Sequence, residues 1–298
     1  MNTRRRIKKD HWGYFFIFPF FAVFAVFNLY PILYTLRLSF TDWDGIRDAG
    51  WVGAANYIRL LGDRIFWKSV LNTIFITVAA GGLQLVSGLV LAYVLNQKFI
   101  KGPHVFKNIF YFPNLVTAVS LGVLFNLLFA WQGGSVNLLL ESIGLIGEPV
   151  NWMINGSFVR AVLIFIIWFQ YFGYYIIIFT AGIKGISGDI LEAAAIDGAG
   201  SFKTFILIVL PLLKPVITYA CVTILIGGMQ LFDIPYIIGK GTGAPNGASL
   251  TALSYMYNTS FKNYNYGYGA AISYGLFLLT IIFSVLYMRG NMKSEEER

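Results

Sequence analysis

Six long apolar runs constrain this chain more than any other feature of its sequence. Each run is near or above the ~20 residues that a helix needs to cross a bilayer. They cover about residues 14–37, 69–95, 105–130, 158–183, 212–238 and 267–288. Only 12% of the residues are charged, about half the fraction typical of a soluble domain. The runs predict an all-α membrane protein with six transmembrane helices in one domain, residues 14–288, between tails at 1–13 and 289–298.

The first run follows a basic cluster, RRRIKK at residues 4–9, which is also how a secretory signal peptide begins. The run is longer than the apolar part of such a signal and lacks a cleavage site of the small-x-small type. We therefore expect a retained transmembrane helix. Its aromatic stretch, YFFIFPFF, is expected to face lipid or to pack against other helices.

The positions of the basic residues predict the topology. Of the 22 Lys and Arg residues, 14 lie in the two tails and in the second and fourth loops, whereas six are spread over the other three loops. By the positive-inside rule, both termini and the 184–214 loop are cytoplasmic. This distribution also accounts for the net charge of +8, so we expect no nucleic-acid partner.

The sequence offers little to a catalytic or metal site. Cys221 is the single cysteine, and both histidines, His11 and His104, are cytoplasmic by this topology. The GKGTG stretch at 239–243 lacks the upstream glycine of a phosphate loop. We therefore expect a chain that is not an enzyme, binds no cofactor and hydrolyses no nucleotide itself.

The loop between the fourth and fifth runs, over residues 184–211, has an unusual composition. Asp189 and Glu192 form a potential capping pair for a short helix, and the three alanines at 193–195 add helix propensity with little bulk. The two glycines that follow are expected to end this helix, Ser201 to cap the next, and Pro211 and Pro215 to bend the chain. The pattern is typical either of an ordinary amphipathic connector or of a small helix that another protein can approach closely.

The spacing in this loop favours the second interpretation. It matches E-A-A-x3-G-x9-I-x-L-P at every fixed position: Glu192, Ala193, Ala194, Gly198, Ile208, Leu210 and Pro211. Through this motif the chain resembles the permease subunits of binding-protein-dependent ABC importers. The resemblance implies that the short helix docks into a cleft of an ATPase subunit and that Glu192 makes a polar contact there.

The resemblance extends over nearly the whole chain and is strongest to the carbohydrate-uptake branch of that family. Within that branch the chain is similar to the larger maltose-type and the glycerol-phosphate-type permease subunits, so a glycerol phosphate or a polyol stays open beside a sugar. The stretches that carry it are WVGAANYIRLLGD, FPNLVTAVSLGVLFNLLF, MQLFDIPYIIGKGTGAP and SYMYNTSFKNYNYGYGAAIS. Residues 241–245 depart from the usual T-x-G-G-P. The resemblance implies a bacterial or archaeal inner membrane, a homologous second permease, two ATPase subunits that use ATP and Mg, an extracytoplasmic sugar-binding protein, and a sugar or oligosaccharide substrate.

A sugar site needs hydrogen-bonding groups and aromatic faces around a cavity. The fourth run offers Gln170, Tyr171 and Tyr174, and the fifth offers Thr223, Gly227 and Gln230 on one helical face. These positions match or adjoin those that line the sugar site of the maltose-type subunit that the chain resembles. We expect them to contact substrate.

Asp233 is the only carboxylate within a predicted span, and a charge at membrane depth is a functional hypothesis by default. It is expected either to contact substrate or to support the break near Pro235 and take part in gating. Gly81 and Gly82 are expected to permit close helix packing. The first outer loop contains IRLLGDRIFWKSVL, whose periodicity predicts an interfacial helix.

Two other function classes remain open at this stage. An ion- or proton-coupled secondary transporter normally needs several ionisable groups within the membrane, and this chain offers one. An intramembrane enzyme would need a histidine, a paired acid or a serine elbow at membrane depth, none of which we find.

Overall fold

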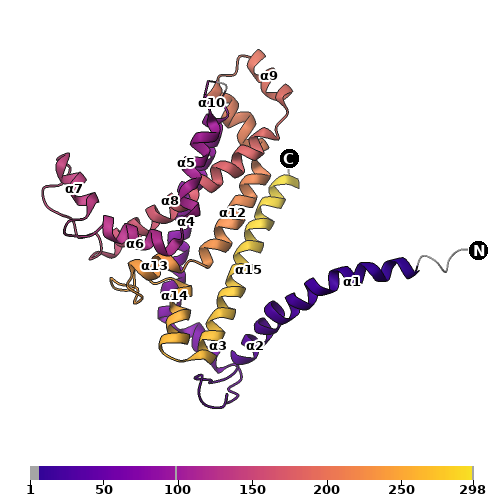
Figure 1. Cartoon of the computed structure of the whole chain (residues 1–298), viewed down its shortest axis with the longest axis vertical. Helices are drawn as coiled ribbons and strands as arrows, with labels where there is room; N and C mark the ends of the chain where they lie inside the picture. Colours follow the sequence, from indigo (N-terminus) through magenta and orange to yellow (C-terminus); the bar gives the residue numbers. More distant parts are fainter. Residues whose placement is uncertain (1–6, 98, 297–298) are drawn as a thin grey trace, which may run out of the picture. The chain divides into compact units, whose positions relative to one another are not determined.

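The computed structural model describes residues 7–97 and 99–296 of the chain. Residues 1–6, 98, 297 and 298, which include the start of the predicted basic tail and the end of the C-terminal tail, lie outside the described residues. The described part is helical, and its single β-type feature is an isolated bridge between Thr41 and Trp51 (Figure 1). The chain divides into two compact units, Met1–Asp63 with Met256–Gly275 and Arg64–Tyr255 with Leu276–Arg298.

The first unit holds the first apolar run. The run forms α1 (Ile7–Phe24), the π-helical turn η1 (Ala25–Leu29) and α2 (Tyr30–Leu38). Its aromatic side chains are exposed, with Phe16 at 76% and Phe27 at 72%, as expected of a helix that lipid covers. The unit also contains α3 (Ala55–Gly62), η3 (Asn258–Lys262) and the first residues of α15 (Tyr266–Glu296).

The loop between α2 and α3 is ordered by local hydrogen bonds. The Asp44 carboxylate accepts from the backbone N–H and guanidinium of Arg47, the latter at 2.7 Å, and from the backbone N–H of Ile46. These bonds hold the pKa of Asp44 well below the ordinary carboxyl range. At the end of α3, Asp63 accepts a hydrogen bond from the Tyr268 hydroxyl at 2.5 Å.

The expected interfacial helix over IRLLGDRIFWKSVL was only partly right. Its first half belongs to α3, which ends at Gly62, and its second half is the start of α4 (Arg64–Leu95). Asp63 separates them in an extended conformation, with φ −79° and ψ 101°. Periodicity alone did not show this one-residue break because both halves are apolar on a helical repeat.

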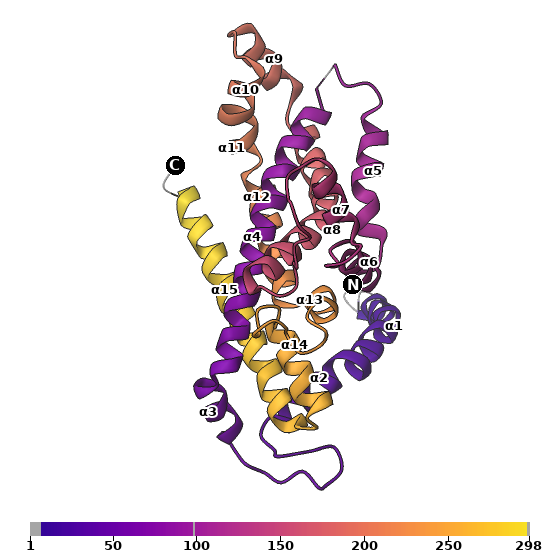
Figure 2. The same cartoon turned by 90° about the vertical axis from the view of Figure 1, so that its left-hand side faces the viewer.

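The second unit contains the remaining spans. Its further elements are α5 (Pro103–Leu115), α6 (Ala118–Leu128), α7 (Ser135–Ser142), α8 (Gly156–Lys184), α9 (Gly188–Ile196), α10 (Ser201–Thr204), η2 (Phe205–Val209), α11 (Leu210–Leu212), α12 (Lys214–Met229), α13 (Asp233–Ile238) and α14 (Ala252–Tyr257). Helix α4 packs along α8, with α5 on α8 and α12 on α4 (Figure 1 and Figure 2). Two clusters of buried side chains fill these contacts, one around Ile166 and one around Ile176 and Phe179.

Close helix contacts in this unit depend on particular glycines. A Cβ on Gly81 would lie 2.5 Å from Ile224, which confirms the packing role expected of Gly81 between α4 and α12. A Cβ on Gly82 would meet nothing within 4 Å, so the same expectation is wrong for Gly82 among the described residues. Gly173 lets α8 approach the backbone of α5, since a Cβ there would lie 1.9 Å from the Phe110 carbonyl oxygen.

The third apolar run is broken rather than straight. Helices α5 and α6 meet at an angle of 93°. Pro113 near the end of α5 and the extended Val116 stop the first helix, and Thr117 caps the second by accepting a hydrogen bond from the Ser120 backbone N–H. Counting this bent pair as one span, the described residues contain six candidate membrane spans, in agreement with the sequence.

Candidate functional site

The 184–211 loop forms the expected short helix, α9, but begins it differently from the prediction. The residue before the helix is Ser187, whose side chain makes no capping bond, and Asp189 lies in the first turn instead of at the cap. The capping pair of Asp189 and Glu192 is therefore wrong. Because Asp189 is in the first turn, its carboxylate still lies at the positive end of the helix dipole.

Gly198 ends α9, as predicted. The Ala199 N–H donates to the Ala194 carbonyl at 2.9 Å and the Gly198 N–H donates to the Ala195 carbonyl at 3.1 Å, which together form a Schellman motif. Gly198 has φ +73°, in the left-handed region that residues with a Cβ rarely adopt. The glycine of the motif therefore has a conformational reason in this structure.

The two faces of α9 differ. Ala194 is buried, and Leu191 is half-buried against the core cluster around Ile176 and Phe179. Glu192 is exposed, and Ile196, four residues later on the same face, is 85% exposed. The other motif alanine, at position 193, is also exposed, so one of the two alanines faces inward and the other outward.

The chain between α9 and α12 is attached to α4 by a tyrosine. The Tyr93 hydroxyl donates to the Ser201 carbonyl at 2.8 Å, and the Tyr93 ring lies 4.8 Å from that of Phe205. Ser201 is the first residue of α10 and not its cap, which is Gly200, so that expectation was wrong. The motif's leucine and proline, at 210 and 211, follow the π-helical turn η2 and open α11.

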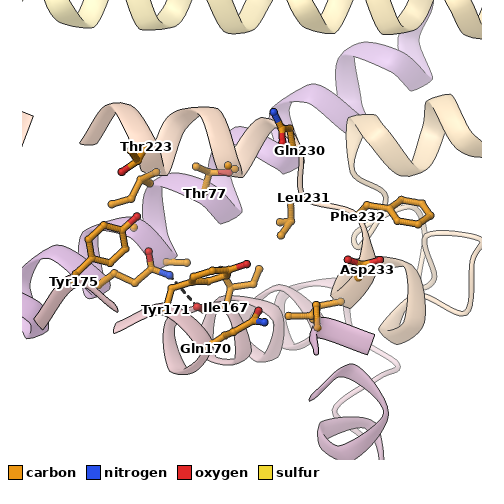
Figure 3. Close-up of a pocket in the computed structure, with 18 residues that line it drawn as sticks. Thr77, Ile167, Gln170, Tyr171, Tyr175, Thr223, Gln230, Leu231, Phe232 and Asp233 are labelled. Atoms are coloured by element: carbon orange, nitrogen blue, oxygen red, sulfur yellow. Dashed lines mark hydrogen bonds between the residues drawn. The ribbon is translucent and has the colours of Figure 1, made fainter. Parts of the chain in front are cut away.

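A cavity of about 190 Å³ lies among α4, α8, α12 and α13. Its polar lining comes from all four helices and from the break between α12 and α13 (Figure 3). The residues that line it are Thr77, Ala80, Gly81, Gln84, Ala118, Ile167, Gln170, Tyr171, Tyr175, Thr223, Ile224, Gly227, Gly228, Gln230, Leu231, Phe232, Asp233 and Ile234.

The structure brings six of the seven predicted substrate residues to this one cavity: Gln170, Tyr171, Thr223, Gly227, Gln230 and Asp233. Tyr174 is not among the lining residues, and Tyr175 is. Tyr174 and Tyr175 are three and four residues after Tyr171, so both lie on the same side of α8, and helical spacing alone does not separate them. The Tyr174 ring instead stands edge-on to that of Tyr175, with centroids 5.2 Å apart.

Two polar side chains at the cavity have unused hydrogen-bonding capacity. The Thr77 hydroxyl oxygen and the Gln170 carbonyl oxygen are buried and have no hydrogen-bond partner among the described residues. By contrast, Gln84 donates to the Ile167 carbonyl at 2.8 Å, and the Thr223 hydroxyl donates to the Ala220 carbonyl at 2.8 Å. Buried polar atoms without a partner are rare, so these two atoms require an explanation.

The position of Asp233 leaves both expectations for it open. It is the first residue of α13, after a three-residue break at the end of α12, and its carboxylate lies at the positive end of that short helix. It is also an exposed lining residue, at the end of the cavity remote from Thr223 in Figure 3. Substrate contact and support of the helix break are both compatible with this position.

Several lining residues were not predicted from the sequence, and three of these, Thr77, Gln84 and Tyr175, carry polar groups. Thr77 and Gln84 are seven residues apart on α4, so they share a helical face. Polar residues at this spacing inside an apolar run were the available signal for a cavity-facing side of the second span.

Comparison with known proteins places this geometry in a family. Residues 84–292 match the family described as binding-protein-dependent transport system inner membrane component. The lactose transport system permease protein LacF of Rhizobium radiobacter is 34% identical over 96% of this chain and 96% of its own length. The trehalose/maltose transport system permease protein MalF of Thermococcus litoralis is 32% identical over 97% and 96%, and the multiple sugar-binding transport system permease protein MsmF of Streptococcus mutans is 32% identical over 98% and 99%.

Two solved structures share the fold. One is a bacterial ABC transporter involved in the import of the acidic polysaccharide alginate, with a TM-score of 0.81 at 20% identity over 98% of this chain and 99% of that one. The other is a bacterial alginate ABC transporter in complex with an alginate pentasaccharide-bound periplasmic protein, with a TM-score of 0.83 at 19% identity over 96% of each chain.

Proposed function

This chain belongs to the inner-membrane components of binding-protein-dependent transport systems, and from that membership we propose distinct roles for its cavity and its 184–211 loop. It is a multi-pass membrane protein and a carbohydrate-uptake ABC permease, a transport component and not an enzyme. Membership of this family excludes the ion- or proton-coupled secondary transporter that the sequence left open. The proposal concerns where the chain contacts sugar and how it is coupled to ATP hydrolysis.

We propose that the cavity is this chain's share of the sugar pathway. The observation that carries the proposal is the pair of buried, unpartnered acceptors, Thr77 Oγ1 and Gln170 Oε1, beside the aromatic faces of Tyr171 and Tyr175. Sugar hydroxyls donate hydrogen bonds, and sugar rings pack on aromatic faces. The relatives named for lactose, for trehalose/maltose and for multiple sugars support a sugar or oligosaccharide as substrate.

The size of the cavity supports a second homologous permease. Sites for small molecules usually enclose ~300–1,000 Å³. The cavity of this chain is about 190 Å³, too small for an oligosaccharide on its own. A partner permease that faces α8 and α12 would enlarge and close it, so the pathway would lie between two subunits.

The 184–211 loop is proposed to couple the permease to ATP hydrolysis. In α9, Ala194 is buried and Leu191 packs against the core cluster around Ile176 and Phe179, while Glu192 and Ile196 remain exposed on one face. The exposed carboxylate and the exposed apolar side chain give this face of α9 both a polar and an apolar group for contact with another protein. We propose that two ATPase subunits, which bind the ATP and Mg, receive this helix and that both chain termini lie on the same, cytoplasmic side.

Coupling requires that movement of α9 reach the cavity. Leu191 of α9 packs against the core cluster around Ile176 and Phe179 of α8, the helix that carries Gln170 and Tyr171. Tyr93 links the following segment to α4, which carries Thr77. A displacement of α9 therefore acts on both walls of the cavity. Closure of the ATPases would then favour one of two arrangements of the helices, and an extracytoplasmic binding protein would deliver sugar to the open one.

Sugar uptake into vesicles tests the assignment of the cavity. The vesicles would contain this chain, the second permease, the ATPase and the binding protein, and neutral oligosaccharides would be tested in turn. Gln170→Leu removes the unpartnered acceptor, so we expect about a tenfold rise in the KM of uptake. Gln97→Leu, two residues beyond the end of α4, should leave KM unchanged. Equal KM values for the two variants would refute the proposal that Gln170 contacts the sugar.

A further inference from the structure

The 239–251 loop between α13 and α14 is unusually well packed for a connection rich in glycine. Ser249 and Ala248 are 1% and 4% exposed, and Thr251 is fully buried. Inside the loop, the Ser249 hydroxyl donates to the Ala244 carbonyl at 2.7 Å, and the Ala248 N–H donates to the Pro245 carbonyl at 2.8 Å. Burial and internal hydrogen bonds therefore hold the loop in place.

Side chains of α4 hydrogen-bond to this loop and to the first residue of α14. The Asn72 amide donates to the Gly247 carbonyl at 2.7 Å and to the Leu250 carbonyl at 3.2 Å. One residue later on α4, the Thr73 hydroxyl oxygen accepts from the Ala252 backbone N–H at 2.9 Å. Asn72 is thus the residue that holds the loop at two points.

Arg160 of α8 determines which way Asn72 faces. Its guanidinium donates to Asn72 Oδ1 at 3.0 Å. Arginine has only donors, so this bond directs Oδ1 to Arg160 and leaves both N–H groups of Nδ2 for the loop carbonyls.

The polar groups around Arg160 leave part of its guanidinium without a hydrogen-bond partner among the described residues. Its Nε is buried and has no hydrogen-bond partner among the described residues, and the guanidinium forms no ion pair with any of them. Partial burial of a cation without a carboxylate is costly, which argues for a role beyond stability.

The loop is in turn joined to the cavity. The Thr251 hydroxyl donates to the Leu231 carbonyl at 2.7 Å. Leu231 lies in the break between α12 and α13 and lines the cavity. Continuous hydrogen bonds and covalent connections therefore run from Arg160 through Asn72 and the loop to the cavity wall.

We propose that Arg160 is a positioning residue, which through Asn72 and the 239–251 loop fixes the cavity wall at Leu231. It acts on substrate only through this wall. The part of the inference that concerns sugar rests on the proposed function, whereas the part that concerns the position of Leu231 does not.

The test follows the accessibility of position 231 in the assembled transporter. Cys221 is the only cysteine, so a chain with Cys221→Ala and Leu231→Cys carries one thiol, at the cavity wall. Arg160→Met and Asn72→Asp are added separately. Aspartate still accepts from Arg160 but cannot donate to the loop carbonyls. Arg160→Lys, which keeps the charge and a donor, is the rescue variant, and Arg64→Met, at an exposed arginine that begins α4, is the matched control.

Arg160→Met and Asn72→Asp should each speed labelling of the thiol introduced at position 231 by about fivefold or more, the effect of losing one or two hydrogen bonds. The labelling agent is a water-soluble thiol reagent. In substrate-stimulated ATP hydrolysis, both variants should have a higher KM for sugar than the parent, and their kcat should stay within about twofold of the parent value. Arg160→Lys and Arg64→Met should behave like the parent. If Asn72→Asp does not assemble, Asn72→Ser, which keeps an acceptor and loses the amide donors, replaces it.

If Arg160→Met and Asn72→Asp are labelled at the same rate as Arg64→Met, the inference is overturned. If they are labelled faster but their KM is unchanged, the part of the inference that concerns sugar is overturned. If no sugar stimulates the parent transporter, the proposed function fails, and the labelling comparison still decides whether Arg160 positions the wall. The two failures are therefore distinguishable.

Discussion

Replacing Thr77 by valine should raise the stability of the protein while weakening its response to sugar. Thr77 is 6% exposed, and its hydroxyl oxygen has no hydrogen-bond partner among the described residues. Valine has the same shape, so the tight contact with Gly228 of α12 is kept. Removing a buried hydroxyl that lacks a partner should stabilise the fold by up to ~1 kcal/mol, part of the ~1–3 kcal/mol that such a group costs.

The same change removes one acceptor for a sugar hydroxyl. A hydrogen bond contributes ~0.5–1.5 kcal/mol, which corresponds to an increase in KM of about two- to thirteenfold. Thermal unfolding in detergent measures the first effect, where ~1 kcal/mol is a rise in Tm of about 2–4 °C. Substrate-stimulated ATP hydrolysis measures the second.

Thr223→Val is the matched control. The Thr223 hydroxyl already donates to the Ala220 carbonyl, so its removal should not raise Tm. If Thr77→Val lowers Tm as much as the control does, the hydroxyl has a partner in the protein. If it raises Tm and leaves KM unchanged, the unused acceptor is not where sugar binds.

Three further predictions concern other parts of the chain. Gly198→Ala should destabilise the end of α9 by ~1–2 kcal/mol because residue 198 has a positive φ, and Gly198→Asn should destabilise it by less. Substrate-stimulated ATP hydrolysis should therefore fall more in Gly198→Ala than in Gly198→Asn, and equal activities of the two variants would contradict this prediction. Gly173→Ala forces a methyl group against the Phe110 carbonyl and should cost ~1–3 kcal/mol or more in thermal unfolding, whereas Gly82→Ala should cost nothing. Hydrogen bonds lower the pKa of Asp44, so the ionised carboxylate stabilises the first loop above the ordinary carboxyl pKa, and this stabilisation is lost as pH falls through the lowered pKa. Tryptophan fluorescence of the loop should therefore be constant from neutral pH to about pH 4. Asp44→Asn should abolish any change in fluorescence at acid pH.

Much of the fold could be predicted from the sequence because bilayer thickness and backbone hydrogen bonding leave few choices for apolar runs. The predicted fourth span, 158–183, is α8, Gly156–Lys184, and the second begins five residues before its predicted start. The 93° bend between α5 and α6 was not predicted. Pro113 and the Thr117 cap interrupt the apolar run, and the apolar pattern does not show in which direction the chain continues after them.

The cavity was predicted in position but not in full. Residues on α8 and α12 were found because polar groups in an apolar run are conspicuous, but which side chains of α8 reach the cavity depends on its packing against α4 and α5, which the sequence does not show. Tyr175 lines the cavity, and Tyr174 does not. The link from Arg160 to Asn72 joins residues 88 positions apart and depends wholly on the tertiary structure.

The most direct test of the account is sugar-stimulated ATP hydrolysis by the reconstituted transporter with Glu192→Ala, compared with Asp197→Asn, an exposed acidic residue that lies after α9. Glu192→Ala should still assemble with the ATPase subunits and should lose sugar stimulation, while Asp197→Asn should retain it. Full stimulation in Glu192→Ala would contradict the central claim that α9 couples the ATPase to the sugar pathway.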